Sequence, residues 1–560
     1  MRNMKDRVVT NIIDNNVENN MLLLRDLTKE EALALLNADE GCVENIENYK
    51  NLHKGIKFLM ESIENNEDIA IQIDPDADGF FSSAIAFLSI YEDLDYDNIN
   101  YIINDDKNHG FQLEKIDALI KSGIKLLIIP DGGSVEIEPL KLLVENDIKV
   151  IILDHHLIEI KDELREIERN IALINNQDGQ VENIYLSGCG VTYKFFKKVF
   201  ELNNIIIGNK YLDLVACSLV SDVCNLKYSY ENRYYLNKGS KVVNITNPFL
   251  VEICNSMKKR KIDTLTIEDI GFSIAPIINS TIRLGTLEDK NNLFNAIIGT
   301  EDFISHRGKL ITYPQKARLI GTNFQKKQRE YVNNNVDIVE KEIKNKKLDE
   351  DNVIFYIDEE RKIEKSLRGL LCNKMLSNFE KPIMLGTEYK NSINGSARGY
   401  GDMDFKQFCE DTGLFNYLKG HDNAFGFSID KDKISDFIDK ANKYLEIKDK
   451  KIEVEKIYDT VVPRGDVLII STYEDLWCSD IKAPLYFINN AVFKVSDIKK
   501  TGTSTYEFKN DKMSVFKYFG SKAWFEELIK GEEYITLDIL AEFRKKNGTS
   551  KIIMKDCEKI

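Results

Sequence analysis

Residues 68–79 read DIAIQIDPDADG, a short β-type apolar run that ends directly in three alternating aspartates, Asp74, Asp76 and Asp78. Side chains just past the carboxyl end of a strand line the crevice in which open α/β sheets bind ligands. Asp-x-Asp-x-Asp-Gly also resembles the start of a calcium loop, but Ile85 stands at the twelfth position, where such a loop carries glutamate. We therefore expect this stretch to begin a βαβ unit with carboxylates at its rim.

The alternation of strand and helix continues beyond this stretch. Short β-type runs separated by helical stretches occupy residues 98–104, 125–131, 149–156 and 170–176. This order is typical of βαβ units and predicts a mostly parallel sheet. Runs that are apolar throughout, such as LLIIP and VIIL, suit strands that are buried on both faces.

Further acids and imidazoles follow the later strands. Asp131 precedes a pair of glycines, Asp154-His155-His156 ends the next run, and Asp222 lies in the segment VACSLVSDV. A single aspartate at a strand end is usually a turn residue or a helix cap, and for Asp131 alone that interpretation is favoured. Four such segments in succession instead indicate one shared site.

So many carboxylates in one place require a cation, because like charges a few ångströms apart otherwise force protonation. Two divalent ions about 3.5–4 Å apart can generate hydroxide and stabilise both oxygens of an in-line phosphoryl displacement. Mixed carboxylate and imidazole ligands favour manganese or magnesium over a structural zinc ion. The sequence therefore predicts a site for two divalent metal ions, manganese or magnesium.

Composition limits the class of protein. The chain has 560 residues, 43% of them hydrophobic and 30% charged, which is typical of several globular domains. No apolar run approaches the roughly 18 residues of a membrane span, and the N-terminus lacks a secretory pattern, so we expect a cytoplasmic protein without membrane contacts. The net charge of −16 argues against a general nucleic-acid coat protein but leaves open a local basic channel.

Other sites are not indicated. The nine cysteines include no C-x-x-C pair, so neither a disulfide framework nor a thiolate zinc site is expected. No G-x-G-x-x-G follows a strand, which excludes a dinucleotide fingerprint. His109 could lie near a nucleotide, but a turn is the simpler interpretation, and the basic run at 257–261 is most simply a solvated face.

Four of these motifs, DPDADGFFSSAIAF, PDGGS, LDHH and LSGCGVTYKFF, resemble in order the successive motifs of the DHH phosphoesterase superfamily. Within it, the chain resembles the RecJ-type single-strand-specific exonucleases. Three later segments support this closer resemblance: APIINSTIRLG (275–285), INGSARGY (393–400) and KGHDNAFGF (419–427).

The resemblance and the element pattern together imply an α/β protein with four main parts after an N-terminal helical segment at 1–60. These are a parallel-sheet DHH domain at 61–240, a long helical connector at 241–350, a second α/β (DHH-associated) domain at 351–448, and a C-terminal β-barrel of oligonucleotide-binding type at 449–560. The connector includes a helix-prone stretch from about 313 to 347. Aromatic residues in the last part could stack bases, but such residues in short strands are more often core: Tyr473, Trp477, Tyr486, Phe493 and Phe508.

The resemblance further implies two-metal, 5′-to-3′ hydrolysis of single-stranded DNA to mononucleotides, in DNA repair or recombination. The implied catalytic residues are Asp131, His155 and His156. The implied metal ligands are Asp74, Asp76, Asp78, Asp131, His155 and Asp222, with Asp131 between both ions and Asp154 orienting the imidazoles. The implied phosphate contacts are Asn279, Arg283, Ser396, Arg398 and His421.

Two alternatives stay open. One is a DHH phosphodiesterase for oligoribonucleotides or cyclic dinucleotides, which generally lacks the terminal barrel. The other is a catalytically inactive replication scaffold, against which the complete set of acids and imidazoles argues. The expected partner is single-stranded DNA, and a single-strand-binding protein or a helicase is a further candidate.

Overall fold

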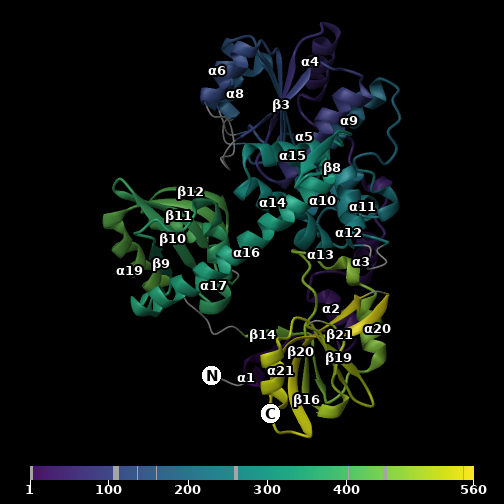
Figure 1. Cartoon of the computed structure of the whole chain (residues 1–560), viewed down its shortest axis with the longest axis vertical. Helices are drawn as coiled ribbons and strands as arrows, with labels where there is room; N and C mark the ends of the chain where they lie inside the picture. Colours follow the sequence, from purple (N-terminus) through teal and green to yellow (C-terminus); the bar gives the residue numbers. More distant parts are fainter. Residues whose placement is uncertain are drawn as a thin grey trace.

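The computed structural model describes residues 4–104, 113–134, 137–158, 161–257, 263–401, 403–445, 451–502, 504–546 and 548–560. In this part of the chain, two five-stranded sheets and one seven-stranded sheet form the main bodies, and two small two-stranded sheets accompany them. Figure 1 shows the first sheet at the top, the second at the left and the third at the bottom, with helices between them.

The first sheet has five parallel strands in the order β3-β2-β4-β5-β6. Their bounds are β2 Ile69–Ile73, β3 Ile99–Ile103, β4 Leu126–Pro130, β5 Lys149–Asp154 and β6 Ile171–Asn175. The predicted parallel sheet is therefore confirmed. Strands β2, β4 and β5 are neighbours, so their carboxyl ends lie side by side.

Helices cover both faces of this sheet, and strands β2, β4 and β6 are accordingly buried at every residue. They are α4 Leu52–Glu64, α5 Ala77–Leu88, α6 Leu113–Ser122, α7 Ile137–Glu145, α8 Lys161–Ile167 and α9 Gly188–Leu202. Ile71 shares one core with residues of α4, α5 and α9, whereas Ala70 shares the other with residues of α6 and α7. The alternation of side chains along β2 assigns neighbouring residues to opposite faces.

A helical region follows the first sheet. It comprises α10 Leu212–Ser221, α11 Tyr230–Gly239, α12 Pro248–Met257, α13 Ile267–Asp269, α14 Ala275–Leu284, α15 Leu287–Ile297, the hairpin β7 Phe303–His306 and β8 Lys309–Thr312, and α16 Tyr313–Asn345. The 33-residue α16 is the predicted long connecting helix. Gly321 lets α16 pack closely on α14, because a Cβ there would lie 2.5 Å from Cγ2 of Ile277.

The second body is also α/β. Its strand order is β12-β13-β11-β10-β9, in which only β9 and β10 run parallel. The elements are β9 Ile354–Ile357, α17 Arg368–Phe379, β10 Ile383–Tyr389, β11 Ser392–Arg398, α18 Phe405–Thr412, β12 Phe415–His421, β13 Ala424–Asp430 and α19 Ile434–Tyr444. Helix α16 carries the chain to this body (Figure 1).

The C-terminal body is a seven-stranded sheet with the order β15-β16-β20-β21-β19-β18-β17. Its elements are β14 Ile452–Val454, β15 Lys456–Asp459, α20 Arg464–Ser471, β16 Tyr486–Lys494, β17 Lys499–Lys500, β18 Tyr506–Lys509, β19 Ser514–Lys517, α21 Lys522–Ile529, β20 Tyr534–Lys546 and β21 Thr549–Lys559. Closure into an oligonucleotide-binding barrel stays a prediction. The aromatic residues considered for base stacking are all buried: Tyr473, Trp477, Tyr486, Phe493 and Phe508.

The N-terminal helices pack on this C-terminal body. The N-terminal elements are α1 Met4–Arg7, β1 Val8–Thr10, α2 Val17–Leu23 and α3 Lys29–Leu36, and β1 pairs with β14. Met21 and Leu35 belong to the same core as Ile488 and Leu537 of the C-terminal sheet. Ends of the chain that are far apart in sequence thus form one core. In the described residues, every helix is too short or too polar to cross a bilayer.

Candidate metal centre

Three strand ends supply the first carboxylates of the site. Asp74 directly follows β2, Asp131 follows β4, and Asp154 is the last residue of β5. Because these three strands are adjacent and parallel, the carboxylates meet at one edge of the sheet, where open α/β sheets bind ligands.

The turn from β2 into α5 keeps two acids together. Asp76 is the N-cap of α5, and its Oδ1 accepts a hydrogen bond of 2.9 Å from the backbone N–H of Gly79. A Cβ at Gly79 would lie 2.5 Å from the carbonyl oxygen of Asp74, so only glycine permits this close packing of helix on strand end. Asp76 therefore caps helix α5 and also belongs to the group of candidate metal ligands.

Asp78 is held by the start of α9. Its Oδ2 accepts from the backbone N–H of Gly188 at 2.9 Å, and its Oδ1 accepts from that of Cys189 at 3.0 Å and from the Ser218 hydroxyl at 2.5 Å. A Cβ at Gly188 would lie 2.5 Å from Oδ1 of Asp131. The N-terminus of α9 thus stabilises one buried carboxylate and makes room for another.

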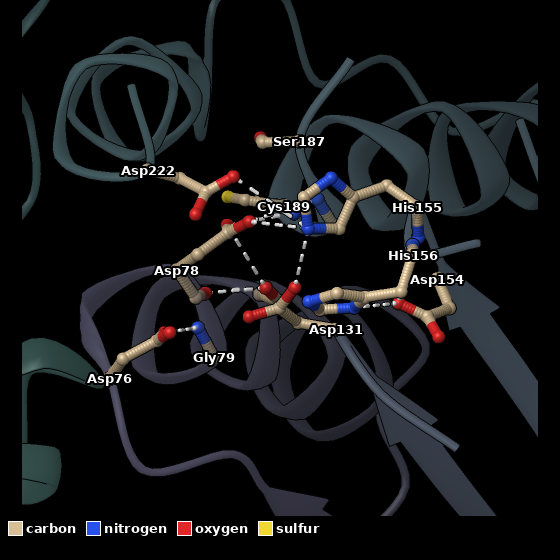
Figure 2. Close-up of polar contacts among 12 residues, drawn as sticks. Asp76, Asp78, Gly79, Asp131, Asp154, His155, His156, Ser187, Cys189 and Asp222 are labelled. Carbon is tan, nitrogen blue, oxygen red and sulfur yellow. Dashed lines mark hydrogen bonds and ion pairs between the residues drawn. The ribbon is translucent and has the colours of Figure 1, made fainter. Parts of the chain in front are cut away.

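Asp131 and His155 lie at the middle of the group (Figure 2). Nε2 of His155 is 3.2 Å from Oδ1 of Asp131, 3.7 Å from Oδ2 of Asp222 and 3.9 Å from Oδ2 of Asp78. Asp222 is the C-cap of α10. Among the described residues, no hydrogen bond reaches the buried Oδ1 of Asp131, although the imidazole lies at contact distance.

The side chains form two adjacent sets with the spacing of metal ligands. In each set, one candidate ligand atom per residue lies within 4.8 Å of the others: Asp74, Asp76 and Asp131 in the first, Asp78, His155 and Asp222 in the second. A third overlapping set contains Asp131, Asp154, His155 and His156. All the ligands predicted from the sequence are therefore brought together.

The acids strongly disfavour one another's charge. Burial raises the pKa of Asp131 well above its ordinary value, and the charges of Asp78, Asp76, Asp74 and Asp222 raise it further. Burial likewise raises the pKa of Asp78, and that of Asp222 to about 7. An orphaned buried oxygen among mutually repelling carboxylates is a good fit to a divalent cation, which removes this repulsion.

Asp154 behaves differently from the other acids. Burial alone would raise its pKa, but a hydrogen bond with Nδ1 of His156 at 2.8 Å and the charges of both imidazoles hold the pKa below its ordinary value. It also accepts the backbone N–H of His155 at 2.7 Å. Burial would lower the pKa of His156, yet Asp154 and nearby acids raise it to about 9. Asp154 thus contacts the ring of His156 and the backbone of His155.

Two predicted phosphate contacts lie on α14. Asn279 and Arg283 are one turn apart on α14 and both are half-buried. Burial lowers the pKa of Arg283, whereas the charge of Asp76 raises it and that of Arg398 lowers it further. Arg283 therefore lies within electrostatic reach of both the site and the second body.

The other predicted phosphate contacts lie on the second body. Ser396 and Arg398 are on β11, and Nε of Arg398 donates to Oδ1 of Asn373 at 2.9 Å. Within the described ranges, neither Arg283 nor Arg398 has a carboxylate partner at salt-bridge distance. His421 ends β12, and its side chain lies outside the described part of the structure.

Some contributors were not foreseen from the sequence. The N–H groups of Gly188 and Cys189 and the hydroxyl of Ser218 hold Asp78, and the run of small residues at 187–190 was the available signal. Burial raises the pKa of the Cys189 thiol well above its ordinary value, which is consistent with an inert cysteine. His109 and residues 258–261 lie outside the described residues.

Comparisons with known proteins agree with this geometry. Residues 68–219 match the model of the DHH family, N-terminal domain. The chain is 28% identical over 550 residues to the candidate SPbeta prophage-derived single-strand DNA-specific exonuclease YorK of Bacillus subtilis, covering 93% of this chain and 92% of that protein. The fold resembles that of RecJ of Thermus thermophilus in complex with Mn²⁺, with a TM-score of 0.71 at 16% sequence identity. The match covers 99% of this chain and 80% of that chain. The structure of the same protein in complex with Mg²⁺ has a TM-score of 0.65 at 16% sequence identity. That match covers 99% of this chain and 79% of the other.

Proposed function

Because residues 68–219 match the DHH family model and the chain resembles a single-strand DNA-specific exonuclease over nearly its whole length, we propose that it is a RecJ-type DHH phosphoesterase that hydrolyses phosphodiester bonds of single-stranded DNA as an exonuclease. The observation that carries this proposal is the pair of adjacent ligand sets, joined by the 3.2 Å approach of His155 to Asp131. The name of the YorK relative, which is similar over nearly the whole chain, supports single-stranded DNA as the substrate.

Two divalent ions, manganese or magnesium, fit these ligands. One ion would be held by Asp74, Asp76 and Asp131, and the other by Asp78, His155 and Asp222, with Asp131 between them. Carboxylate-rich sets with one imidazole suit these metals. When bound, the pair would supply an activated water and stabilise the charge that develops on the scissile phosphate.

In this proposal, His156 contacts that phosphate. Its Nδ1 is bound to Asp154, which raises its pKa to about 9 and keeps the imidazole cationic at neutral pH. Its side chain is 54% exposed, whereas that of Asp154 is 1% exposed, so the ring faces the open side of the site. A cation in this position would draw the scissile phosphate toward the metal ligands.

The cleavage direction that we propose is 5′ to 3′. Arg283 and Arg398 have no carboxylate partner among the described residues and lie close enough to repel each other. A planar guanidinium fork suits a phosphate group, and two of them would hold one near the end of the strand. With Asn279, Ser396 and His421, they would position the next linkage over the metal ligands and release mononucleotides.

The test is hydrolysis of end-labelled strands. Purified protein with Mn²⁺ should release labelled mononucleotide from 5′-labelled single-stranded DNA at once, and from 3′-labelled strands only late. RNA strands of the same sequence should be cut more slowly. The Asp131→Asn variant serves as the inactive control.

Three results would contradict the proposal. Cleavage from the 3′ end would reverse the direction, and activity confined to oligoribonucleotides of a few residues or to cyclic dinucleotides would indicate the short-substrate phosphodiesterase. Absence of hydrolysis with both metals, together with retained binding of single strands, would indicate the inactive scaffold. The expected process is DNA repair or recombination, with a single-strand-binding protein or a helicase as a candidate partner.

A further inference from the structure

Two partly exposed tyrosines lie on the loops that lead into and away from the metal centre. Tyr185 is three residues before Gly188, and Tyr228 is six residues after Asp222. Their ring centroids are 6.2 Å apart with planes at 36°, and 36% and 62% of their surfaces are exposed. Three residues of chain place Cα of Tyr185 within about 11 Å of Cα of Gly188. Both rings are therefore carried by segments that begin or end at residues of the metal centre.

A buried side chain holds both loops together. Nδ2 of Asn232, which is fully buried, donates to the carbonyl oxygen of Tyr185 at 2.8 Å and to that of Asn225 at 3.0 Å. Oδ1 of Asn225 in turn accepts the backbone N–H of Tyr228 at 2.8 Å. One amide thus connects the backbones of the two tyrosine-bearing segments.

The network continues inward through charged groups. Asn183 donates to Oδ1 of Asn232 at 3.0 Å and to Oε2 of Glu231 at 2.8 Å, and Nζ of Lys194 binds Oε1 of Glu231 at 2.7 Å. All four side chains are buried, and none of them touches a predicted metal ligand in the described contacts. Such a fully paired buried network makes the positions above it rigid.

The second loop is also fixed to the C-terminal body. The backbone N–H of Leu226 donates to Oδ2 of Asp480 at 2.9 Å, and its carbonyl accepts from Nε of Arg233 at 2.7 Å. Nη2 of Arg233 binds the carbonyl oxygen of Leu476 at 2.7 Å. The tyrosine pair therefore lies where the metal-bearing domain meets the C-terminal sheet.

We propose that Tyr185 and Tyr228 form a platform on which bases of the bound single strand stack as the strand passes between the metal centre and the C-terminal body. This inference rests on the proposed function. Exposed aromatic rings bind any base by its face, and a nearby cation assists. Nζ of Lys227 lies 5.0 Å from the centroid of the Tyr228 ring. The aromatic residues considered in the C-terminal body are buried, so these two rings supply a stacking surface that those residues do not.

The test measures binding and turnover of full-length variants. Tyr185→Ala and Tyr228→Ala should each weaken binding of a 20-nucleotide single strand by roughly 5- to 150-fold, the range for one stacked base. The KM should rise accordingly with kcat nearly unchanged, and Tyr228→Phe should keep wild-type binding. Hydrolysis of a dinucleotide, which has fewer bases to stack, should be altered less than hydrolysis of the 20-nucleotide strand.

A matched control comes from the second body. Tyr444 is 62% exposed and has Nζ of Lys443 at 4.8 Å from its ring centroid, so it reproduces the setting of Tyr228 away from the metal centre. Tyr444→Ala should leave binding unchanged. An equal loss in the Tyr444 and Tyr228 variants would overturn the proposal, because any exposed aromatic would then have the same effect.

A second measurement separates stacking from phosphate contact. A single abasic site, moved along the strand, should weaken binding by wild-type protein at one or two positions. At those positions, the same abasic site should not weaken binding by Tyr228→Ala any further. The loss of affinity in the tyrosine variants should be nearly independent of salt concentration, whereas the loss of a phosphate contact would depend on it. Equal sensitivity of wild type and variant at every position would overturn the platform. If wild-type protein with Mn²⁺ leaves single-stranded DNA intact, the proposed function itself fails.

Discussion

At the scale of single residues, Asp131 combines a strained backbone with an unfavourable charge. Its φ of 61° lies in the left-handed region, which asparagine tolerates better than alanine does. Burial and neighbouring carboxylates raise its pKa, so the stability that it contributes is present below pH 4 and is lost as pH rises through its folded pKa. Without metal, the aspartate therefore destabilises the protein at neutral pH.

Asp131→Asn should abolish activity while stabilising the metal-free protein. Loss of a shared ligand removes several kcal/mol of transition-state stabilisation, about a thousandfold in rate. Thermal unfolding in EDTA should show a higher Tm than wild type at pH 8 and a similar Tm near pH 4. Added Mn²⁺ should stabilise wild type far more than the variant. A lower Tm for metal-free Asp131→Asn at pH 8 would contradict this account.

The raised pKa of Asp222 predicts how metal binding depends on pH. Burial raises its pKa to about 7, so at pH 6 its carboxyl is mostly protonated and must lose a proton before it can bind a cation. Affinity for Mn²⁺ should rise by up to about tenfold per pH unit below 7 for this one proton and then level off. Calorimetry in buffers of different ionisation heat measures the released protons. When Mn²⁺ binds at pH 6, the Asp222→Asn variant should release one proton fewer than wild type. An equal number of released protons would refute the assignment of Asp222 as a metal ligand.

At the scale of elements, the start of α9 determines whether the carboxylates of the metal centre can lie close together. Gly188 lies against Asp131, and its added Cβ would be 2.5 Å from Oδ1 of that residue. Gly188→Ala should therefore displace Asp131 and weaken Mn²⁺ binding by about 10- to 100-fold, as loss of a supporting contact does. Gly465→Ala is the control, because nothing lies within 4 Å of its Cβ position in the first turn of α20. Equal metal affinity of Gly188→Ala and wild type would contradict this packing argument.

At the scale of the whole molecule, the two ends of the chain depend on each other. Met21 and Leu35 of the N-terminal helices are buried in one core with Ile488 and Leu537 of the C-terminal sheet. Removal of residues 446–560 alone should therefore expose apolar helix faces and give aggregating protein. Removal of both 1–39 and 446–560 should leave a soluble chain that still binds Mn²⁺.

Size-exclusion chromatography and thermal unfolding distinguish these two chains. The chain that keeps only the N-terminal helices should bind a hydrophobic dye and elute as aggregates, whereas the doubly shortened chain should elute as a discrete species. Soluble, cooperatively unfolding protein after C-terminal removal alone would show that the shared core is dispensable.

Local sequence patterns are sufficient to predict the parallel sheet, the long connecting helix and the acids and imidazoles at the sheet edge. These follow from local rules, because strand periodicity and position after a strand place a side chain without knowledge of distant contacts. For that reason the sequence alone assigns Asp74, Asp131 and Asp154 to one rim of the sheet. The resemblance then added residues of the second body, such as Arg398.

The contacts that hold these groups in place form only in the folded chain. The N–H groups of α9 that bind Asp78, the amide of Asn232 that joins two loops, and the N-terminal helices buried against the C-terminal sheet all involve residues far apart in sequence. Hydrophobic burial and hydrogen bonding across such separations depend on three-dimensional proximity, which leaves no periodicity in the chain. The ligands were therefore readable from local pattern, whereas their supports became visible only in the folded chain.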